Sequence, residues 1–219
     1  MTATSPLLAQ QAISGQQPLP TPGWVEMFDQ GEADPGLKGF RTPRGIKLEV
    51  AAQQPAVVNP RLLAFGDDGT PYVIEWRPGE LREESQDVAL EGGRSIKHFR
   101  TTKSTRDVLK SLHDTNGDGV FDEARVVMDD LELPSGLLVN DGWFYWTSGG
   151  RVLRRRPFDP MLAEQLAAAA TEKRGPPTTV TGDGKWLEQL LISGLSGVIH
   201  FQAVGLSLGP DGCLYVACG

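Results

Sequence analysis

The stretch Leu62–Val73, with the sequence LLAFGDDGTPYV, decides the fold class of this chain. Two later stretches repeat its pattern: Gly136–Trp146 has the sequence GLLVNDGWFYW, and Gly205–Val216 has GLSLGPDGCLYV. Each copy contains an apolar segment, an Asp-Gly pair and a second apolar segment that includes a tyrosine. Because Asp-Gly supplies the positive φ that a tight turn between two strands requires, each copy predicts a β-hairpin.

Further strands are expected between the copies, since their spacing exceeds the ~40–50 residues of a minimal propeller blade. In the first unit, Val108–Leu112 and Ala124–Met128 predict a second hairpin. In the second unit, Val152–Arg156 predicts a third strand and Trp186–Ile192 a closing outer strand. Four strands in each unit, with the first strand innermost, is the geometry of a propeller blade.

One short helix is expected within the second unit. Asp159 suits the N-cap, Pro160 suits the first helical position, Met161–Glu172 is rich in Ala and Leu, and Gly175 can end the helix. The predicted fold is therefore all-β: a partial β-propeller of about two and a half four-stranded blades, of a six-bladed type, with one inserted helix. The alternative is an open antiparallel sheet or a two-sheet sandwich whose hairpins are similar by chance.

Composition divides the chain into three parts. Residues 1–23 are polar and predict a flexible lead, residues 24–45 predict an irregular arm, and residues 46–219 predict the incomplete propeller domain. Within the third part, Ile46–Ala51 alternates apolar and charged residues, which predicts a strand before the first inner strand. Because such blades cannot close a ring alone, we expect the chain to be the opening part of a longer protein and to be inactive by itself.

The composition is that of a folded protein, since 39% of the 219 residues are hydrophobic and 22% are charged. The formal net charge of -7 disfavours a nucleic-acid partner, which requires clustered Lys and Arg. We interpret the one basic run, Arg151 with Arg154–Arg156, as a solvated strand face. No apolar run is long enough to predict a membrane span, and Leu7–Ala9 is too short for the apolar region of a signal peptide.

The two cysteines, Cys213 and Cys218, are too few for a disulfide scaffold. We expect them to be small buried residues, and pairing across a hairpin stays open. No CxxCH sequence occurs, so no c-type haem attachment is expected within this stretch.

A candidate calcium loop runs from Asp114 to Asp122 with the sequence DTNGDGVFD. Calcium prefers hard oxygen ligands, and Gly119 permits the sharp bend that such a loop needs. The flanking segments are predicted strands, so the ion would staple a hairpin; the alternative is an Asx/Gly turn without an ion. The candidate ligands are the side chains of Asp114, Asn116, Asp118 and Asp122 and the carbonyl of Val120.

Two further candidates lie where strand ends face the mouth of a propeller channel. His200, just before the third inner strand, is a candidate general base; the alternative is a buried or loop histidine without catalysis. Glu75 and Arg77, directly after the second strand of the first unit, are candidate cofactor-binding residues, and the alternative is an ion pair within the blade.

Several stretches resemble the membrane-bound dehydrogenase family of planctomycetes and their relatives, whose propeller is similar to the soluble glucose/sorbosone dehydrogenases. The resemblance covers roughly Gly23 to Gly219, and the channel histidine of the sugar dehydrogenases aligns with Phe201, one residue after His200. The matching stretches are Asn59–Pro60, Tyr72–Glu75, Asp114–Asp122, Leu133–Gly136 and Gly209–Val216.

The resemblance implies a periplasmic or extracellular protein of the sugar- or alcohol-dehydrogenase type, which oxidises a CH–OH group. Its implied cofactors are pyrroloquinoline quinone and calcium, with His200 as the catalytic base and electrons passed to a downstream haem domain. The alternative function is a non-catalytic, calcium-stabilised propeller that binds a carbohydrate or a protein partner.

Overall fold

The computed structural model describes residues 32–33, 37, 40, 42–43, 45–89, 91–198 and 202–218. It is mostly β, with 51% strand and one α-helix among the described residues. The chain divides into two units, residues 1–50 and 51–219.

In the first unit, β1 (Glu32–Ala33) pairs in parallel with β2 (Lys47–Leu48). The regular strand expected at Ile46–Ala51 is therefore confined to Lys47 and Leu48. The predicted lead, residues 1–23, lies outside the described residues, as does most of the predicted arm.

The second unit begins with a four-stranded antiparallel sheet, which we call the first sheet. Its spatial order is β3 (Pro60–Phe65), β4 (Pro71–Glu75), β7 (Asp107–His113) and β8 (Glu123–Leu131). The hairpins predicted around Asp68-Gly69 and around the Asp114 loop are both confirmed. The sheet has four strands, and their order in space follows their order in the sequence, as predicted for one blade.

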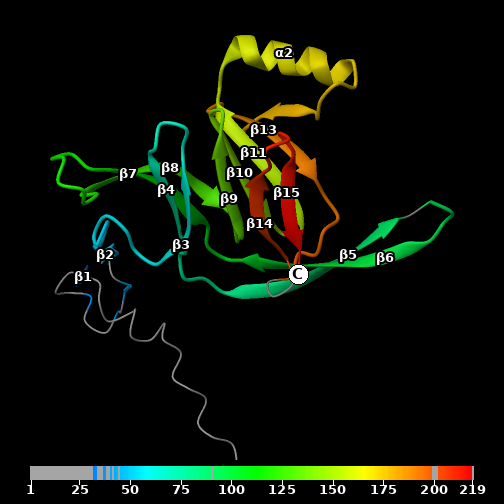
Figure 1. The fold of residues 1–219 in the computed structure, drawn as a ribbon. Helices are drawn as coiled ribbons and strands as arrows, with labels where there is room; N and C mark the ends of the chain where they lie inside the picture. The colour runs from blue at the N-terminus through cyan, green and yellow to red at the C-terminus, as the bar shows by residue number, and fades with distance from the viewer. Residues whose placement is uncertain are drawn as a thin grey trace, which may run out of the picture. The chain divides into compact units, whose positions relative to one another are not determined.

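A long ribbon interrupts the first sheet between β4 and β7. Its strands β5 (Leu81–Ala89) and β6 (Ser95–Lys103) pair only with each other as a two-stranded sheet, and Figure 1 shows them extending away from the larger sheets. The ribbon was not predicted from the sequence, because every residue of β5 is exposed and no alternation of apolar and polar residues marks this strand. The backbone of β6 contacts the loop after β13, where the Thr101 amide donates to the Gly197 carbonyl at 2.9 Å.

The second sheet has five antiparallel strands, one more than predicted. The tight turn between its first two strands has positive φ at Asp141 and Gly142, as expected for Asp-Gly. In spatial order the strands are β9 (Gly136–Asn140), β10 (Trp143–Ser148), β11 (Arg151–Pro157), β13 (Trp186–Ile192) and β12 (Thr178–Val180).

Helix α2 (Pro160–Thr171) connects β11 to β12, and its predicted start is confirmed. The Asp159 side chain accepts hydrogen bonds from the amides of Met161 and Leu162, at 2.9 and 3.2 Å. The predicted end at Gly175 is wrong, because Lys173 adopts the left-handed conformation that turns the chain away two residues earlier.

The third predicted hairpin is confirmed as β14 (Ala203–Leu208) and β15 (Leu214–Cys218). The expectation of buried cysteines is wrong. Cys213 and Cys218 are free and exposed, because the first belongs to the hairpin turn and the second ends a strand of a two-stranded sheet.

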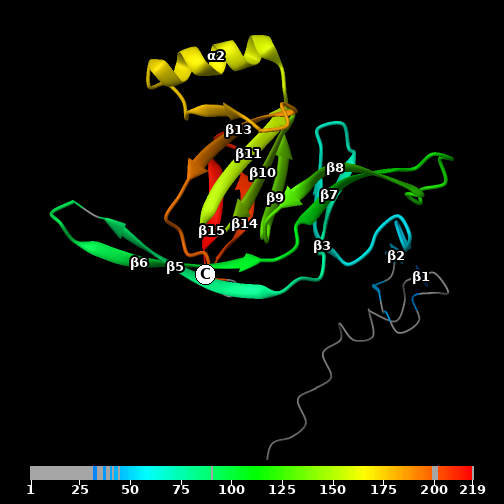
Figure 2. The same cartoon turned by 180° about the vertical axis from the view of Figure 1, so that it is seen from behind.

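The first strands of the first sheet, of the second sheet and of the third hairpin are neighbours, with β9 between β3 and β14 (Figures 1 and 2). One face of the second sheet packs on the first sheet through Phe144 and Trp146, and the other face presents Trp143 and Tyr145 to helix α2 and the third hairpin. Gly136 permits the close approach of β9 to β14, since a Cβ there would meet the Leu206 side chain at 3.3 Å. The described strands form no closed ring.

Candidate functional site

The Asp114 loop is organised by its own carboxylates. Asp114 accepts hydrogen bonds from the amides of Gly117 (2.7 Å) and Gly119 (2.8 Å), and Asp118 accepts one from Val120 (2.8 Å). Asp122 accepts two bonds from Thr115, through the amide and the hydroxyl. The loop is therefore held by Asx-type bonds to backbone amides in addition to its flanking strands.

These bonds favour the charged carboxylates. The Gly119 amide is the largest cause that holds the pKa of Asp114 below its ordinary value, and the Thr115 hydroxyl has the same effect on the pKa of Asp122. Among the described residues, no three His, Cys, Asp or Glu side chains are grouped closely enough to hold a metal ion. Calcium at this loop would require Asp114, Asn116, Asp118 and Asp122 to turn their oxygens toward one point.

Glu75 is buried at the end of β4 and is already paired. Its Oε1 accepts hydrogen bonds from Lys110 Nζ and from the Val58 amide, both at 2.8 Å. Lys110 lies on the neighbouring strand β7 and also donates to the Ala56 carbonyl at 3.3 Å. This is an ion pair within the first sheet, although its cation is Lys110 and not Arg77.

Arg77 is exposed, and its backbone is fixed by a second buried pair. The Arg77 amide donates to Asp107 Oδ1 at 2.8 Å, and the Arg77 carbonyl accepts from Lys103 Nζ at 2.9 Å. Lys103 and Asp107 form a fully buried ion pair at the base of the ribbon, and the Trp76 ring lies 5.1 Å from the ammonium group. The structure thus brings Glu75 and Arg77 to the same strand end without bringing their side chains together.

His200, the predicted catalytic base, lies outside the described residues, as does Phe201. The other two histidines have structural contacts. His98 Nε2 lies 2.7 Å from the Leu195 carbonyl, and His113 Nε2 lies 2.9 Å from Ser111 Oγ.

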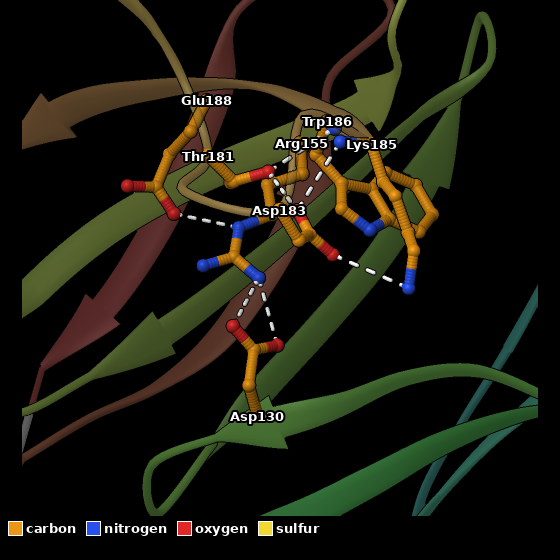
Figure 3. Close-up of polar contacts among 7 residues, drawn as sticks. All are labelled: Asp130, Arg155, Thr181, Asp183, Lys185, Trp186 and Glu188. Atoms are coloured by element: carbon orange, nitrogen blue, oxygen red, sulfur yellow. Dashed lines mark hydrogen bonds and ion pairs between the residues drawn. The ribbon is translucent and has the colours of Figure 1, made fainter.

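A charged seam between the first and second sheets was missed by the sequence analysis. Its centre is Arg155 on β11, whose side chain is only 12% exposed. Arg155 donates to both oxygens of Asp130 on β8 (2.8 and 2.7 Å) and to Glu188 on β13 (2.6 Å), as Figure 3 shows. Burial acts to lower the pKa of the Arg155 guanidinium, but the bonds to Asp130 and Glu188 outweigh it and raise the pKa.

The interpretation of the basic run as a solvated face is therefore wrong. Arg154 points to the opposite face of the sheet from Arg155, where its guanidinium lies 4.2 Å from the Trp143 ring centre and bonds to Gln189 at 2.6 Å. Arg156 lies over the same ring at 5.5 Å. Because successive side chains of a strand point to opposite faces, the sequence could assign the three arginines to alternate faces. It could not predict their partners, which are distant in sequence.

The turn between β12 and β13, which lies next to the charged seam, is stabilised by Asp183. Its Oδ1 accepts a hydrogen bond from the Thr181 hydroxyl at 2.6 Å and from the Lys185 amide at 3.1 Å (Figure 3). The Thr181 bond is the largest cause that lowers the pKa of Asp183. With Asp130, Arg155 and Trp186, these residues line a cleft of about 320 Å³.

Comparison with known proteins gives one family. A family model described as a domain of unknown function (DUF7133) matches residues 32–153, which is more than half of the chain. The chain belongs to this family. No curated protein and no solved structure matches the chain.

The part that matches DUF7133 ends within β11, so it includes the whole first sheet, the ribbon and the Asp114 loop. Arg155 and Glu188 lie beyond it. Among the described residues, no helix has the length and apolar character needed to cross a membrane.

Proposed function

We propose that the chain forms successive blades of a propeller-type sugar or alcohol dehydrogenase, periplasmic or extracellular, as its family resemblance implies. The observation that supports this proposal is the adjacency of β3, β9 and β14. Each of these strands begins one predicted blade and is followed by a tight turn. In a propeller, the first strands of successive blades lie side by side around the central axis.

In this proposal the described sheets act as the scaffold, and His200 supplies the base that removes the substrate's hydroxyl proton. The family resemblance implies pyrroloquinoline quinone as the group that would supply the electron-accepting chemistry, and a downstream haem domain as its partner. The described residues do not by themselves fit the quinone, a tricarboxylate: near Arg77, the cations Lys103 and Lys110 are already paired with Asp107 and Glu75.

Catalysis can be tested on the native gene product supplied with calcium and the quinone. Sugar- or alcohol-dependent reduction of a redox dye is expected, with a loss of about 10²–10⁴-fold in His200→Gln, the usual contribution of a general base. His113→Gln is the matched control, because His113 contacts Ser111 within the first sheet, and it should retain the rate. The absence of substrate-dependent dye reduction in the quinone-loaded wild type would contradict the proposal.

A second candidate function is a non-catalytic propeller that binds a carbohydrate or a protein and is stabilised by calcium. This candidate is favoured because Glu75, Lys103 and Asp107 are buried in ion pairs and are therefore not free to bind a cofactor. Saturable carbohydrate binding without turnover would support this candidate over the first.

A further inference from the structure

A polar cleft of about 330 Å³ lies beside the charged seam, on the side toward the start of β11. It is of the size that small-molecule sites have, at the lower end of their range. Both sheets contribute to it, with Trp146 and Leu131 among its apolar residues. Its charged side chains are Arg106, Asp130, Glu132, Arg151, Arg155 and Glu188.

The three carboxylates of this cleft already have arginine partners. Asp130 and Glu188 bind Arg155, and Glu132 lies 3.2 Å from Arg106. Asp130 is 54% exposed, so it keeps oxygen lone pairs available to a further donor.

Arg151 is the cation of the cleft that the described residues leave without a carboxylate. Its Nε is buried, and no described group accepts a hydrogen bond from it. Leaving such a donor unsatisfied is costly, since a buried polar group is normally hydrogen-bonded. The planar guanidinium fork is suited to bind a carboxylate through two parallel hydrogen bonds.

The backbone around Arg151 fixes its position. Arg151 follows Gly149 and Gly150, which both have positive φ, and it begins β11 opposite Ser148. A Cβ at Gly150 would meet the Leu195 carbonyl at 2.1 Å, so this turn is tightly enclosed. The arginine is thus carried by a rigid strand end, which is what a binding group requires.

We propose that this cleft binds a small polyhydroxylated carboxylate, such as a sugar acid. The ligand's carboxylate pairs with Arg151, and its hydroxyls donate to the oxygens of Asp130 and Glu132. A phosphate fits less well, because its second negative charge would face Asp130, Glu132 and Glu188. The inference rests on the seam alone and is independent of the proposed dehydrogenase function.

Calorimetric titration of the whole chain with D-glucuronate tests the proposal. Saturable binding is expected, at least tenfold tighter than that of D-glucose, which lacks the carboxylate, or of acetate, which lacks the hydroxyls. Arg151→Gln should weaken glucuronate binding by about tenfold to a hundredfold, the usual range for hydrogen bonds to a charged group. Arg156→Gln is the matched control, since Arg156 lies over Trp143 outside this cleft, and it should bind as the wild type does.

Three results with the wild type would overturn the proposal: no saturable glucuronate binding, equal binding of glucose and glucuronate, or tighter binding of inorganic phosphate. Unchanged affinity in Arg151→Gln would also overturn it. Should that variant fail to fold, Arg151→Lys keeps the charge without the fork and is expected to weaken binding. Comparing the affinities of the wild type for glucuronate, glucose, acetate and inorganic phosphate tests the proposal without any variant.

Discussion

Lys103 and Asp107 form an ion pair inside the protein. The Lys103 ammonium group and the Asp107 carboxylate are both fully buried, and each is also bonded to the Arg77 backbone. A buried pair of this kind adds little net stability relative to an apolar pair, but removing one partner leaves an uncompensated charge. At the residue scale, this pair fixes the point where the ribbon leaves the first sheet.

Lys103→Met is expected to lower the free energy of unfolding by about 3–5 kcal/mol, because Asp107 would stay buried without its cation. Urea denaturation measures the loss. Arg82→Met is the control, since Arg82 pairs with Glu80 in an exposed bridge (69% and 66% exposed) worth about 0–1 kcal/mol. Similar losses in the two variants would contradict the role assigned to Lys103.

A second prediction concerns the Asp114 loop at acid pH. The folded pKa of Asp114 is lowered chiefly by the Gly119 amide, so the unfolded loop binds protons more readily than the folded one. The stabilisation is therefore present above the ordinary Asp pKa of about 3.9 and is lost as the pH falls through the lower folded value. Amide shifts of Gly117 and Gly119 should change with a midpoint below the ordinary pKa, and Asp114→Asn should abolish that transition. A midpoint at or above about 3.9 would contradict the prediction.

At the scale of elements, the tight hairpins and helix α2 were predictable because their signals are local. Asp-Gly pairs mark the turns, and Asp159-Pro160 marks the start of the helix. The β5–β6 ribbon was not predictable in this way, since every residue of β5 is exposed and β6 is buried only near its end, at Thr101 and Lys103. The partners of Arg155 were not predictable either, because Asp130 and Glu188 lie on other strands, far away in sequence.

Asp159→Ala is expected to destabilise the chain by about 1 kcal/mol, because the first-turn amides of helix α2 lose their acceptor. Thermal or urea unfolding followed by far-UV circular dichroism measures it. Asp87→Ala on the exposed ribbon is the control and should change stability by no more than about 0.5 kcal/mol. Equal losses of stability in the two variants would contradict the role of Asp159 as the N-cap of helix α2.

At the scale of the whole second unit, one apolar cluster joins the first two sheets. Ile74, Leu109 and Met128 from the first sheet contact Phe144 and Trp146 from the second. The rings of Tyr72 and Phe144 also meet edge to face, with centroids 5.0 Å apart. Because this core is shared, we expect the two sheets to unfold together and not as separate blades.

Phe144→Ala should cost about 3–5 kcal/mol, because it opens a cavity in the shared core. Tryptophan fluorescence and far-UV circular dichroism are expected to give coincident transitions in the wild type. Phe99→Ala is the size-matched control: this side chain is 49% exposed on the ribbon, and its loss should change stability by about 0.5 kcal/mol or less. Two separated transitions in the wild type would contradict the shared core.

The three consecutive arginines of β11 have a consequence for strand alignment. The identical residues at positions 154–156 carry no hydrophobic signal for pairing, yet the two faces of the strand have different surroundings. Arg154 and Arg156 lie over the Trp143 ring, and Arg155 lies over Trp146 and binds Asp130 and Glu188. Because the three residues are identical, a slip by one residue would still place an arginine beside Asp130 and Glu188, but it would turn Leu153 away from the apolar cluster that joins the two sheets. The fully buried Val152 and the core-facing Leu153, and not the run of arginines, therefore determine the alignment of this strand.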